Sequence, residues 1–283
     1  MKIAFSPCPN DTFVFHAWVH GFVPGAPQLD VTYADIDITN GLAAEPGGPD
    51  VLKISCAALP WVMSEYALLP CGGALGRGCG PLVLTAGEGD ACQPAMLSGR
   101  RVAVPSERST AYLLFRLWAA QQVPGGVGEI VVMPFHEIMP AVRDGAVDAG
   151  LVIHEARFTY PTYGLKQVVD LGQWWEEDTG LPIPLGAIIA RRSLDVEAIA
   201  GWLRASVEYG WAHPDASREY VLRHAQELDP EVAQAHINLY VNEYTANLGE
   251  TGYAAINALL GRAAQEGLVP KIDPAALSFP QRA

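Results

Sequence analysis

Basic residues are scarce in this chain of 283 residues, which has 18 lysines and arginines against 31 aspartates and glutamates. The formal net charge is therefore −13 with histidine taken as neutral. Nucleic-acid binding needs a basic surface that neutralises phosphates, and no basic stripe is present to supply one. We expect no nucleic-acid partner, although local dipoles or a few cations can still bind a small anion.

Long hydrophobic runs are also missing, since none comes near the roughly 18 residues that a membrane-spanning helix needs. No membrane partner is expected. The N-terminus passes from Met1-Lys2 straight into a strand-like segment, without the apolar stretch and cleavage site of a secretory signal. We therefore expect a cytoplasmic protein. Half of the residues are hydrophobic and 17% are charged, which is typical of a globular chain.

Cysteine is present without the spacing that would indicate disulfides or zinc. No CxxC pair and no Cys/His cluster with zinc-ligand spacing occurs, so we expect no metal site. His16 and His20 are four residues apart, as metal ligands on a helix often are, but no third ligand is evident. Structural or incidental thiols in a reducing compartment are the expected state of the five cysteines, which are Cys8, Cys56, Cys71, Cys79 and Cys92.

A phosphate-binding loop is lacking as well. The glycine-rich segment 72–80 has neither the GK[ST] ending of a phosphate loop nor the strand–GxGxxG–helix context of a dinucleotide site. Because it leads into an extended segment, a hinge or crossover loop is the favoured interpretation.

Short β-branched runs alternate with amphipathic segments over the first two thirds of the chain, which predicts an α/β fold with a mostly parallel sheet. The helix expected at 110–122 has apolar residues spaced for one buried face. After about residue 195 only helices are expected, near 196–212, 216–227, 230–245 and 250–266. The strands are expected near 2–6, 31–37, 51–55, 81–86, 101–105, 129–134, 149–153, 166–170 and 184–191.

Two segments are typical of places where a chain crosses between lobes. The run 78–84 leaves the glycine-rich loop in extended form, and the run 181–189 contains prolines that disfavour helix. We therefore expect a discontinuous first lobe of residues 1–82 and 188–283, and a contiguous second lobe of residues 83–187, with a central cleft between them.

His154 lies where the apolar run 149–153 ends, before a loop rich in Tyr, Pro and Gly. Ligands of open α/β sheets bind at this carboxyl edge, and histidine is suited to proton transfer near neutral pH. A strand-end histidine that merely bonds a neighbouring loop is the alternative.

Three further strand ends carry polar residues. After the first strand, Asn10 or Asp11 is expected to cap a helix that begins near Thr12, with ligand contact as an alternative. Ser55 is expected near the start of a helix, where it either caps or binds an anion. Ser109 or Thr110 is expected to cap the helix of 110–122 in the same way.

Two arginines are near these segments. Arg77 lies in the glycine-rich loop and Arg157 follows His154, so either side chain has the reach to contact an anion. A structural or surface role is favoured for both.

Six strings occur in one order along the chain, and together they resemble the 1,4-dihydroxy-6-naphthoate synthase family of the futalosine route to menaquinone. The resemblance covers essentially the whole sequence. The strings are Ser6-Pro-Cys-Pro-Asn-Asp-Thr-Phe13, Gly72-Gly-Ala-Leu-Gly-Arg-Gly78, Thr110-Ala-Tyr112, Ile153-His-Glu-Ala-Arg-Phe-Thr-Tyr-Pro161, Val169-Asp-Leu-Gly-Gln-Trp-Trp-Glu176 and Gly180-Leu-Pro-Ile-Pro-Leu-Gly186.

The resemblance implies a two-lobed fold like that of type 2 periplasmic solute-binding proteins. It also implies a lyase that converts cyclic dehypoxanthine futalosine to 1,4-dihydroxy-6-naphthoate with loss of the sugar remnant. The family's proton-accepting histidine matches His154. Substrate-contacting residues match Lys53, Ile54 and Ser55, and Thr110 and Ala111 with Ser109 beside them; Asn10, Asp11 and Arg77 are possible further contacts.

These residues predict a mechanism in which the lobes close over a small anionic substrate and His154 removes a proton. Aromatisation supplies the driving force, so we expect neither metal nor organic cofactor. Two alternatives stay open: a non-catalytic protein that binds a small carboxylate, and the chorismate dehydratase of the same pathway. The sequence does not indicate an oligomeric state.

Overall fold

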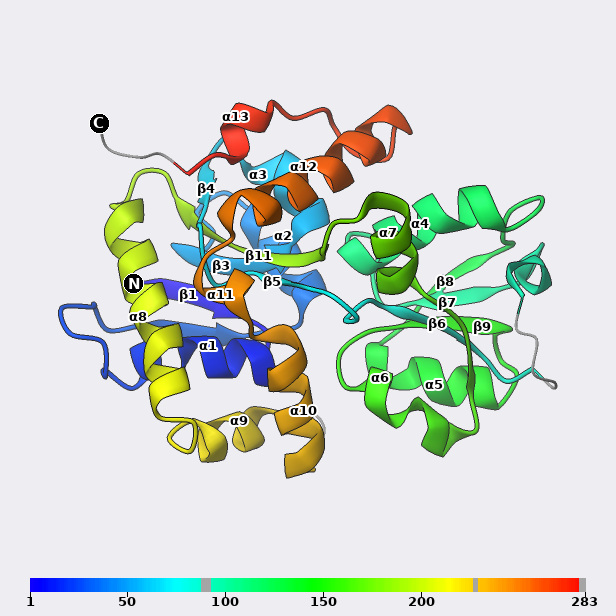
Figure 1. Ribbon diagram of the computed structural model, residues 1–283, viewed down its shortest axis with the longest axis horizontal. Coiled ribbons are helices and arrows are strands. Elements are labelled where there is room, and N and C mark those ends of the chain that lie inside the picture. The colour runs from blue at the N-terminus through cyan, green and yellow to red at the C-terminus, as the bar shows by residue number, and fades with distance from the viewer. Residues whose placement is uncertain (88–92, 226–228, 280–283) are drawn as a thin grey trace. The chain divides into compact units, whose positions relative to one another are not determined.

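The structure is a computed structural model that describes residues 1–87, 93–225 and 229–279 (Figure 1). The chain forms two compact units, of which the first combines Met1–Gly76 with Pro184–Ala283 and the second is Arg77–Ile183. The two crossing points fall inside the glycine-rich segment 72–80 and inside the proline-containing run 181–189. The lobe boundaries expected from the sequence, between residues 82 and 83 and between residues 187 and 188, stay a prediction.

The first unit contains a six-stranded sheet in the order β2-β1-β3-β11-β4, with β5 beside β11. Strand β1 is parallel to β2 and β3, whereas β11 is antiparallel to β3 and β4. The strands are β1 (Lys2–Phe5), β2 (Asp30–Tyr33), β3 (Val51–Ser55), β4 (Tyr66–Leu68), β5 (Ala74–Gly76) and β11 (Ile183–Arg191).

The second unit contains a five-stranded sheet in the order β10-β6-β9-β7-β8. Strand β7 is parallel to β8 and β9, and β6 is antiparallel to β9 and β10. The prediction of a mostly parallel sheet is therefore wrong. Both sheets are mixed, because β6 and β11, the strands next to the two crossings, run against their neighbours. The strands are β6 (Leu82–Thr85), β7 (Val102–Val104), β8 (Ile130–Val132), β9 (Ala149–Val152) and β10 (Lys166–Asp170).

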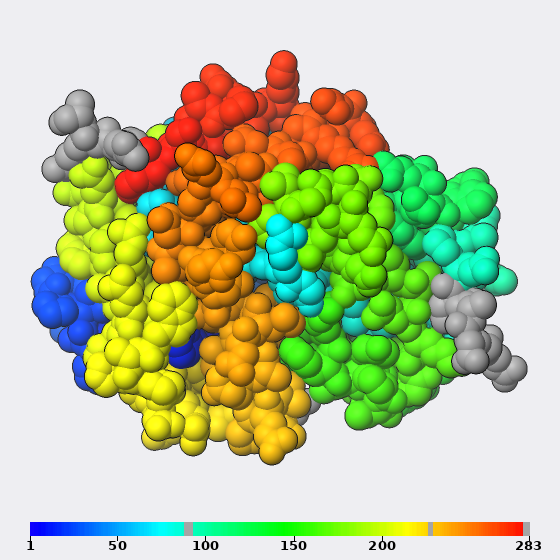
Figure 2. Space-filling view, viewed as in Figure 1, coloured from blue at the N-terminus to red at the C-terminus, as the bar shows by residue number. Residues whose placement is uncertain are grey.

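Helices surround the first sheet, and α8 to α12 form much of the face of this unit seen in Figure 2. The expected helix at 196–212 has the observed bounds, and its Asp195 carboxylate accepts the N–H of Ala198. The expected helix at 230–245 is two helices, because the Asn242 capping box starts a new one. The helices are α1 (Pro9–Val19), α2 (Ile36–Ala44), the 3-10 turn η1 (Cys56–Ala58), α3 (Leu59–Val62), α8 (Val196–Ala212), α9 (Arg218–His224), α10 (Pro230–Tyr240), α11 (Glu243–Ala246), α12 (Gly249–Gln265) and α13 (Pro274–Leu277).

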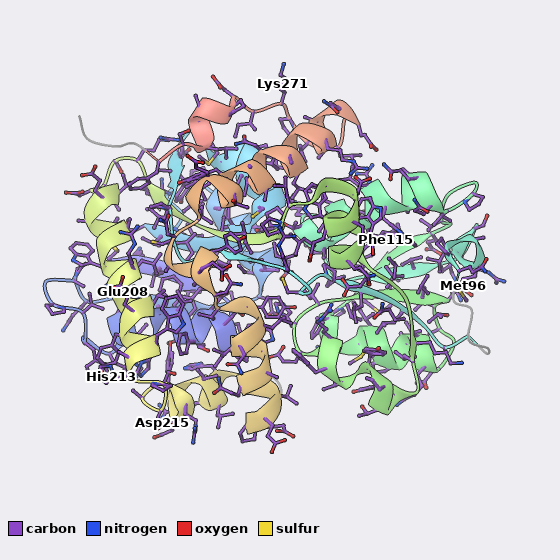
Figure 3. All side chains as sticks on the ribbon, in the orientation of Figure 1. Met96, Phe115, Glu208, His213, Asp215 and Lys271 are labelled. Carbon is purple, nitrogen blue, oxygen red and sulfur yellow. The ribbon has the colours of Figure 1, made fainter. Side chains whose placement is uncertain are left out.

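The second unit has fewer helices, and the predicted helix 110–122 matches α4 in its bounds. In the all-side-chain view, Phe115 of α4 lies in this unit while Glu208, His213, Asp215 and Lys271 lie on exposed parts of the first (Figure 3). The helices are the 3-10 turn η2 (Pro94–Leu97), α4 (Thr110–Gln122), α5 (Phe135–Arg143), α6 (Ala156–Thr159), the 3-10 turn η3 (Tyr160–Tyr163) and α7 (Leu171–Thr179).

Each unit has its own apolar core. In the first, residues of α1, α8, α9 and α10 pack on one face of β1, β3 and β11, where Val51 and Ile188 are fully buried. In the second, α5 packs on β9 so closely that a Cβ at Gly150 would come within 2.5 Å of Ile138. Glycine is therefore needed at this position of β9.

The four described cysteines are free and buried, as expected, and Cys92 lies outside the described residues. Burial raises the pKa of Cys56, Cys71 and Cys79 to about 12, so these thiols are not activated nucleophiles. No helix within the described ranges combines the length and apolar character needed to cross a bilayer.

Candidate active site

The carboxyl ends of β1 and β3 are neighbours in the first unit, because these strands are parallel and in register from Ile3 opposite Val51. The loop that leads from β1 into α1 therefore lies beside the end of β3. This is the sheet edge at which ligands of α/β proteins bind. Polar residues gather there although the surrounding core is apolar.

Lys53 is the most unusual of these residues. It is only 2% exposed, in a strand whose five residues are all buried. Its Nζ lies 2.9 Å from Oδ1 of Asp11 and also donates to the carbonyl oxygen of Gly72 at 3.2 Å. A buried ammonium requires such partners because desolvation of an unpaired charge is costly.

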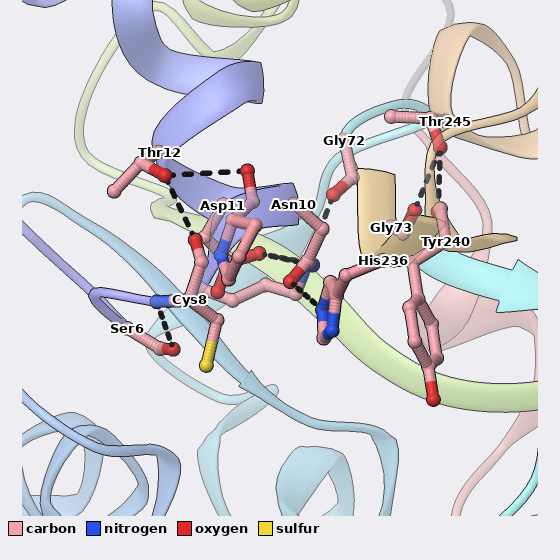
Figure 4. A network of polar contacts seen from close by, with 12 residues as sticks. Ser6, Cys8, Asn10, Asp11, Thr12, Gly72, Gly73, His236, Tyr240 and Thr245 are labelled. Carbon is pink, nitrogen blue, oxygen red and sulfur yellow. Dashed lines mark hydrogen bonds and ion pairs between the residues drawn. The ribbon is translucent and has the colours of Figure 1, made fainter. Parts of the chain in front are cut away.

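The network continues through α1 into α10 (Figure 4). The side-chain amide of Asn10 donates to Oδ1 of Asp11 at 2.8 Å, and its Oδ1 lies 3.0 Å from Nε2 of His236. Neither Asn10 nor Asp11 caps the helix, which contradicts the prediction. The helix begins at Pro9 with Cys8 at the N-cap position, because proline suits the first helical position and needs no N–H acceptor.

Ser55 ends β3 but does not start a long helix. It precedes the three-residue turn η1, and its side chain makes no cap hydrogen bond. The prediction that it caps a helix is therefore wrong. Instead, the side-chain amide of Asn40 makes two hydrogen bonds to Ser55. Its Oδ1 accepts the N–H of Ser55 at 2.8 Å, and its Nδ2 donates to the Oγ of Ser55 at 3.0 Å. Ile54 is fully buried and lies opposite Ala187 of β11 in the sheet.

The second unit also has two parallel neighbouring strands whose carboxyl ends are followed by polar residues. Strands β7 and β9 are parallel neighbours, so the loop after Val104 and the residues after Val152 lie at one edge. Ser109 caps α4 by accepting the N–H of Tyr112 at 3.1 Å, as predicted. Thr110 and Ala111 are buried in the first turn of this helix, where backbone N–H groups have no intrahelical acceptors.

His154 follows β9 by two residues and has a φ of 54°, the one positive φ of a non-glycine residue in the described chain. Histidine tolerates this left-handed conformation better than most residues, yet it is uncommon and recurs at functional sites. Phe135 packs edge-on against the imidazole, with ring centroids 5.3 Å apart. Desolvation lowers the pKa of His154 to about 4, so the ring is neutral at pH 7.

Both arginines have structural partners, as favoured from the sequence. Arg157 donates to the carbonyl oxygen of Gly80 at 2.7 Å and to Asp170 at 2.6 Å. Asp170 also caps α7, so the segment after His154 is tied to a neighbouring helix. Arg77 is half exposed, donates to the carbonyl oxygen of Gly180 and lies 3.6 Å from Glu176.

Sequence reasoning missed the pairing of Lys53 with Asp11 and the link through Asn10 to His236. One signal was available: a lysine inside the apolar run of β3 requires a buried partner. His236 lies in α10 and is only 1% exposed, which places it in the core. No local pattern connects residues 10 and 236.

Comparison with known proteins places these residues in a family. A family model described as menaquinone biosynthesis matches residues 1–265. The chain belongs to this menaquinone-biosynthesis family. A Streptomyces coelicolor protein named 1,4-dihydroxy-6-naphthoate synthase is 71% identical over 99% of this chain and 98% of its own. A Thermus thermophilus protein of the same name is 47% identical over 95% of both chains.

Solved structures agree on the fold of this menaquinone-biosynthesis family member. An Archaeoglobus fulgidus protein matches with a TM-score of 0.83 and 37% identity over 95% of this chain and 98% of its own. The periplasmic aliphatic sulphonate binding protein of Escherichia coli matches with a TM-score of 0.69 over 100% of this chain and 92% of its own. Its 13% identity shows the fold alone. The predicted α/β, periplasmic-binding-protein-like fold is confirmed.

Proposed function

We propose that this protein is a 1,4-dihydroxy-6-naphthoate synthase, a carbon–carbon lyase that converts cyclic dehypoxanthine futalosine to 1,4-dihydroxy-6-naphthoate in menaquinone biosynthesis. The observation that carries the proposal is the 71% identity to the Streptomyces protein of that name over nearly the full length of both chains. The enzyme acts on a small anionic molecule in the cytoplasm, with neither metal nor organic cofactor.

His154 is the general base of the proposed reaction. Its imidazole is neutral at pH 7 because desolvation lowers its pKa, so a ring nitrogen can accept a proton. The electron pair left on the substrate drives elimination of the sugar-derived fragment, and aromatisation of the remaining ring system favours the product. The left-handed backbone at His154 and the edge contact with Phe135 hold the imidazole in one orientation.

The remaining expected contacts bind the substrate's oxygens. Asn40 donates to the Oγ of Ser55, which leaves the hydroxyl proton of Ser55 to donate to the substrate. The start of α4 at Thr110 and Ala111 favours a negatively charged group through its backbone N–H groups and helix dipole. Lys53, in the middle of β3, supplies an ammonium donor.

The direct test is incubation of the purified protein with cyclic dehypoxanthine futalosine, followed by absorbance and mass detection of the naphthoate. A general base contributes about 10²–10⁴-fold, so His154→Ala should lower kcat by that factor. His136→Ala is the matched control, because this histidine is in the same unit and its side chain is 76% exposed. The control should keep the wild-type rate.

The outcomes separate the alternatives. Near-normal turnover by a folded His154→Ala variant would remove His154 as the base while leaving the reaction in place. A wild-type protein that binds small carboxylates tightly without turnover would favour the binding-protein alternative. Release of water from chorismate instead would favour the dehydratase.

A further inference from the structure

Lys53 is the only lysine or arginine among the described residues whose side chain is fully buried. On β3 it shares a face with Val51, which belongs to the apolar core under α1. A buried ion pair adds little to stability compared with apolar residues of similar volume. Its presence in the middle of a fully buried strand, two residues before the carboxyl end at Ser55, therefore suggests a role other than holding the fold.

The hydrogen-bond directions in this network follow from the chemistry of its groups. The carboxylate of Asp11 can only accept, so the group that faces it on Asn10 must be the NH₂ at Nδ2. The amide oxygen of Asn10 then faces His236, whose Nε2 must carry a proton and donate. Figure 4 shows the chain of donors from His236 through Asn10 to Asp11.

The network also fixes how many donors Lys53 has left. An ammonium has three N–H donors, and Asp11 and Gly72 accept two of them. Gly72 is itself held in place, because its N–H donates to the carbonyl oxygen of Thr245 at 2.6 Å. Two fixed acceptors on a tetrahedral ammonium determine the direction of the third N–H.

We propose that His236, Asn10 and Asp11 are positioning residues that hold the Lys53 ammonium so that its third N–H donates to an oxygen of the bound substrate. This inference rests on the proposed function. It gives His236 of α10, from the all-helical part of the chain, a role in orienting a side chain of β3. His236 touches no substrate in this arrangement and acts only through the side chains between it and Lys53.

A double-mutant cycle tests the coupling. His236→Leu removes the donor and should lower kcat/KM about tenfold, as expected for loss of one hydrogen bond to a network that carries charge. His236→Gln, whose amide can donate from a similar position, should restore most of the loss. Lys53→Met should lower kcat/KM by more, and adding His236→Leu to it should have no further effect. His16→Leu, which removes a buried histidine outside the network, should leave kcat/KM unchanged.

Far-UV circular dichroism and thermal unfolding of each variant establish that it is folded. Equal effects of His236→Leu with and without Lys53 would overturn the inference, because the histidine would then not act through the lysine. Wild-type kinetics in a folded His236→Leu variant would also overturn it. A wild-type protein without turnover would overturn the proposed function first, and the inference with it, so the two failures are distinguishable.

Discussion

At the scale of single residues, the lowered pKa of His154 bears directly on its proposed role as the general base. A general base needs an accessible lone pair, and an ordinary histidine with a pKa of 6.5 loses it as the pH falls below neutrality. Desolvation lowers the pKa of His154 to about 4. The proposed base thereby stays unprotonated over a wide range of pH, at the expense of weaker basicity.

We predict that kcat/KM is nearly constant from pH 8 to about pH 5 and falls as the pH approaches 4, because only then does His154 become protonated in the free enzyme. Stopped-time assays between pH 8 and pH 4 measure this dependence of kcat/KM on pH. The residual activity of His154→Ala should lack this decrease if the histidine causes it. A decrease centred on pH 6.5 would contradict the lowered pKa of His154.

His16 carries a second prediction, on stability. Desolvation, followed by repulsion from His20, lowers its pKa from 6.5 to about 4 in the folded state. Between pH 6.5 and pH 4, His16 binds more protons in the unfolded chain than in the folded protein. Its contribution to the free energy of unfolding is therefore fully present above pH 6.5 and decreases as the pH falls toward 4. Between pH 7.5 and 5.0 this one group should remove roughly 2 kcal/mol of unfolding free energy.

Urea unfolding of the wild type and His16→Leu at both pH values measures that contribution. The variant should lose less stability on acidification than the wild type. Some pH dependence should remain, because desolvation also lowers the pKa of His154 to about 4, and desolvation and Arg223 lower that of His224. Identical pH dependence in the two proteins would show that His16 does not contribute.

At the scale of elements, local signals were sufficient for the positions of several helices and of nine strands, and insufficient for two short strands and for strand direction. The apolar spacing of α4 and the Ser109 cap are both local, so its bounds of 110–122 could be predicted. The short strands β4 and β5 contain no β-branched residue and were missed, whereas the equally short β7 and β8 are rich in valine and isoleucine and were predicted. Strand direction was wrong at β6 and β11 because periodicity is the same in parallel and antiparallel strands.

The packing of α5 against β9 gives a prediction at this scale. Gly150→Ala would place a methyl group within 2.8 Å of both Ile138 and Val142. Such overpacking typically costs about 1–3 kcal/mol, and we expect that loss here in urea unfolding at pH 7.5. The activity should fall as well, because β9 leads directly to His154.

Gly201→Ala is the matched control for this substitution. Gly201 lies inside α8, and nothing is within 4 Å of the Cβ that alanine would add. Alanine favours helix over glycine by up to about 1 kcal/mol, so this variant should be unchanged or slightly more stable. A Gly150→Ala variant as stable as the wild type would mean that α5 moves away from β9 without cost.

At the scale of the whole molecule, an acidic chain is proposed to bind an anion. A formal net charge of −13 opposes the approach of a negatively charged substrate. Binding must therefore come from local donors, and Lys53, Ser55 and the start of α4 are the donors that we propose. Composition predicts no nucleic-acid partner, but only the fold shows that Lys53 and Ser55 lie on one strand, β3, and that α4 follows β7, a parallel neighbour of β9.

The division into units carries the last prediction. Arg77–Ile183 is contiguous in sequence, has its own sheet and contains its own apolar core around Leu84 and Ile138. A segment of ordinary domain length with these properties should fold alone. The excised segment is expected to give dispersed amide resonances and one cooperative urea transition. The first unit, by contrast, joins Met1–Gly76 to Pro184–Ala283, so neither of its pieces should fold alone, because β11 completes a sheet that β1 and β3 begin. An unfolded second unit would mean that its sheet depends on the rest of the chain.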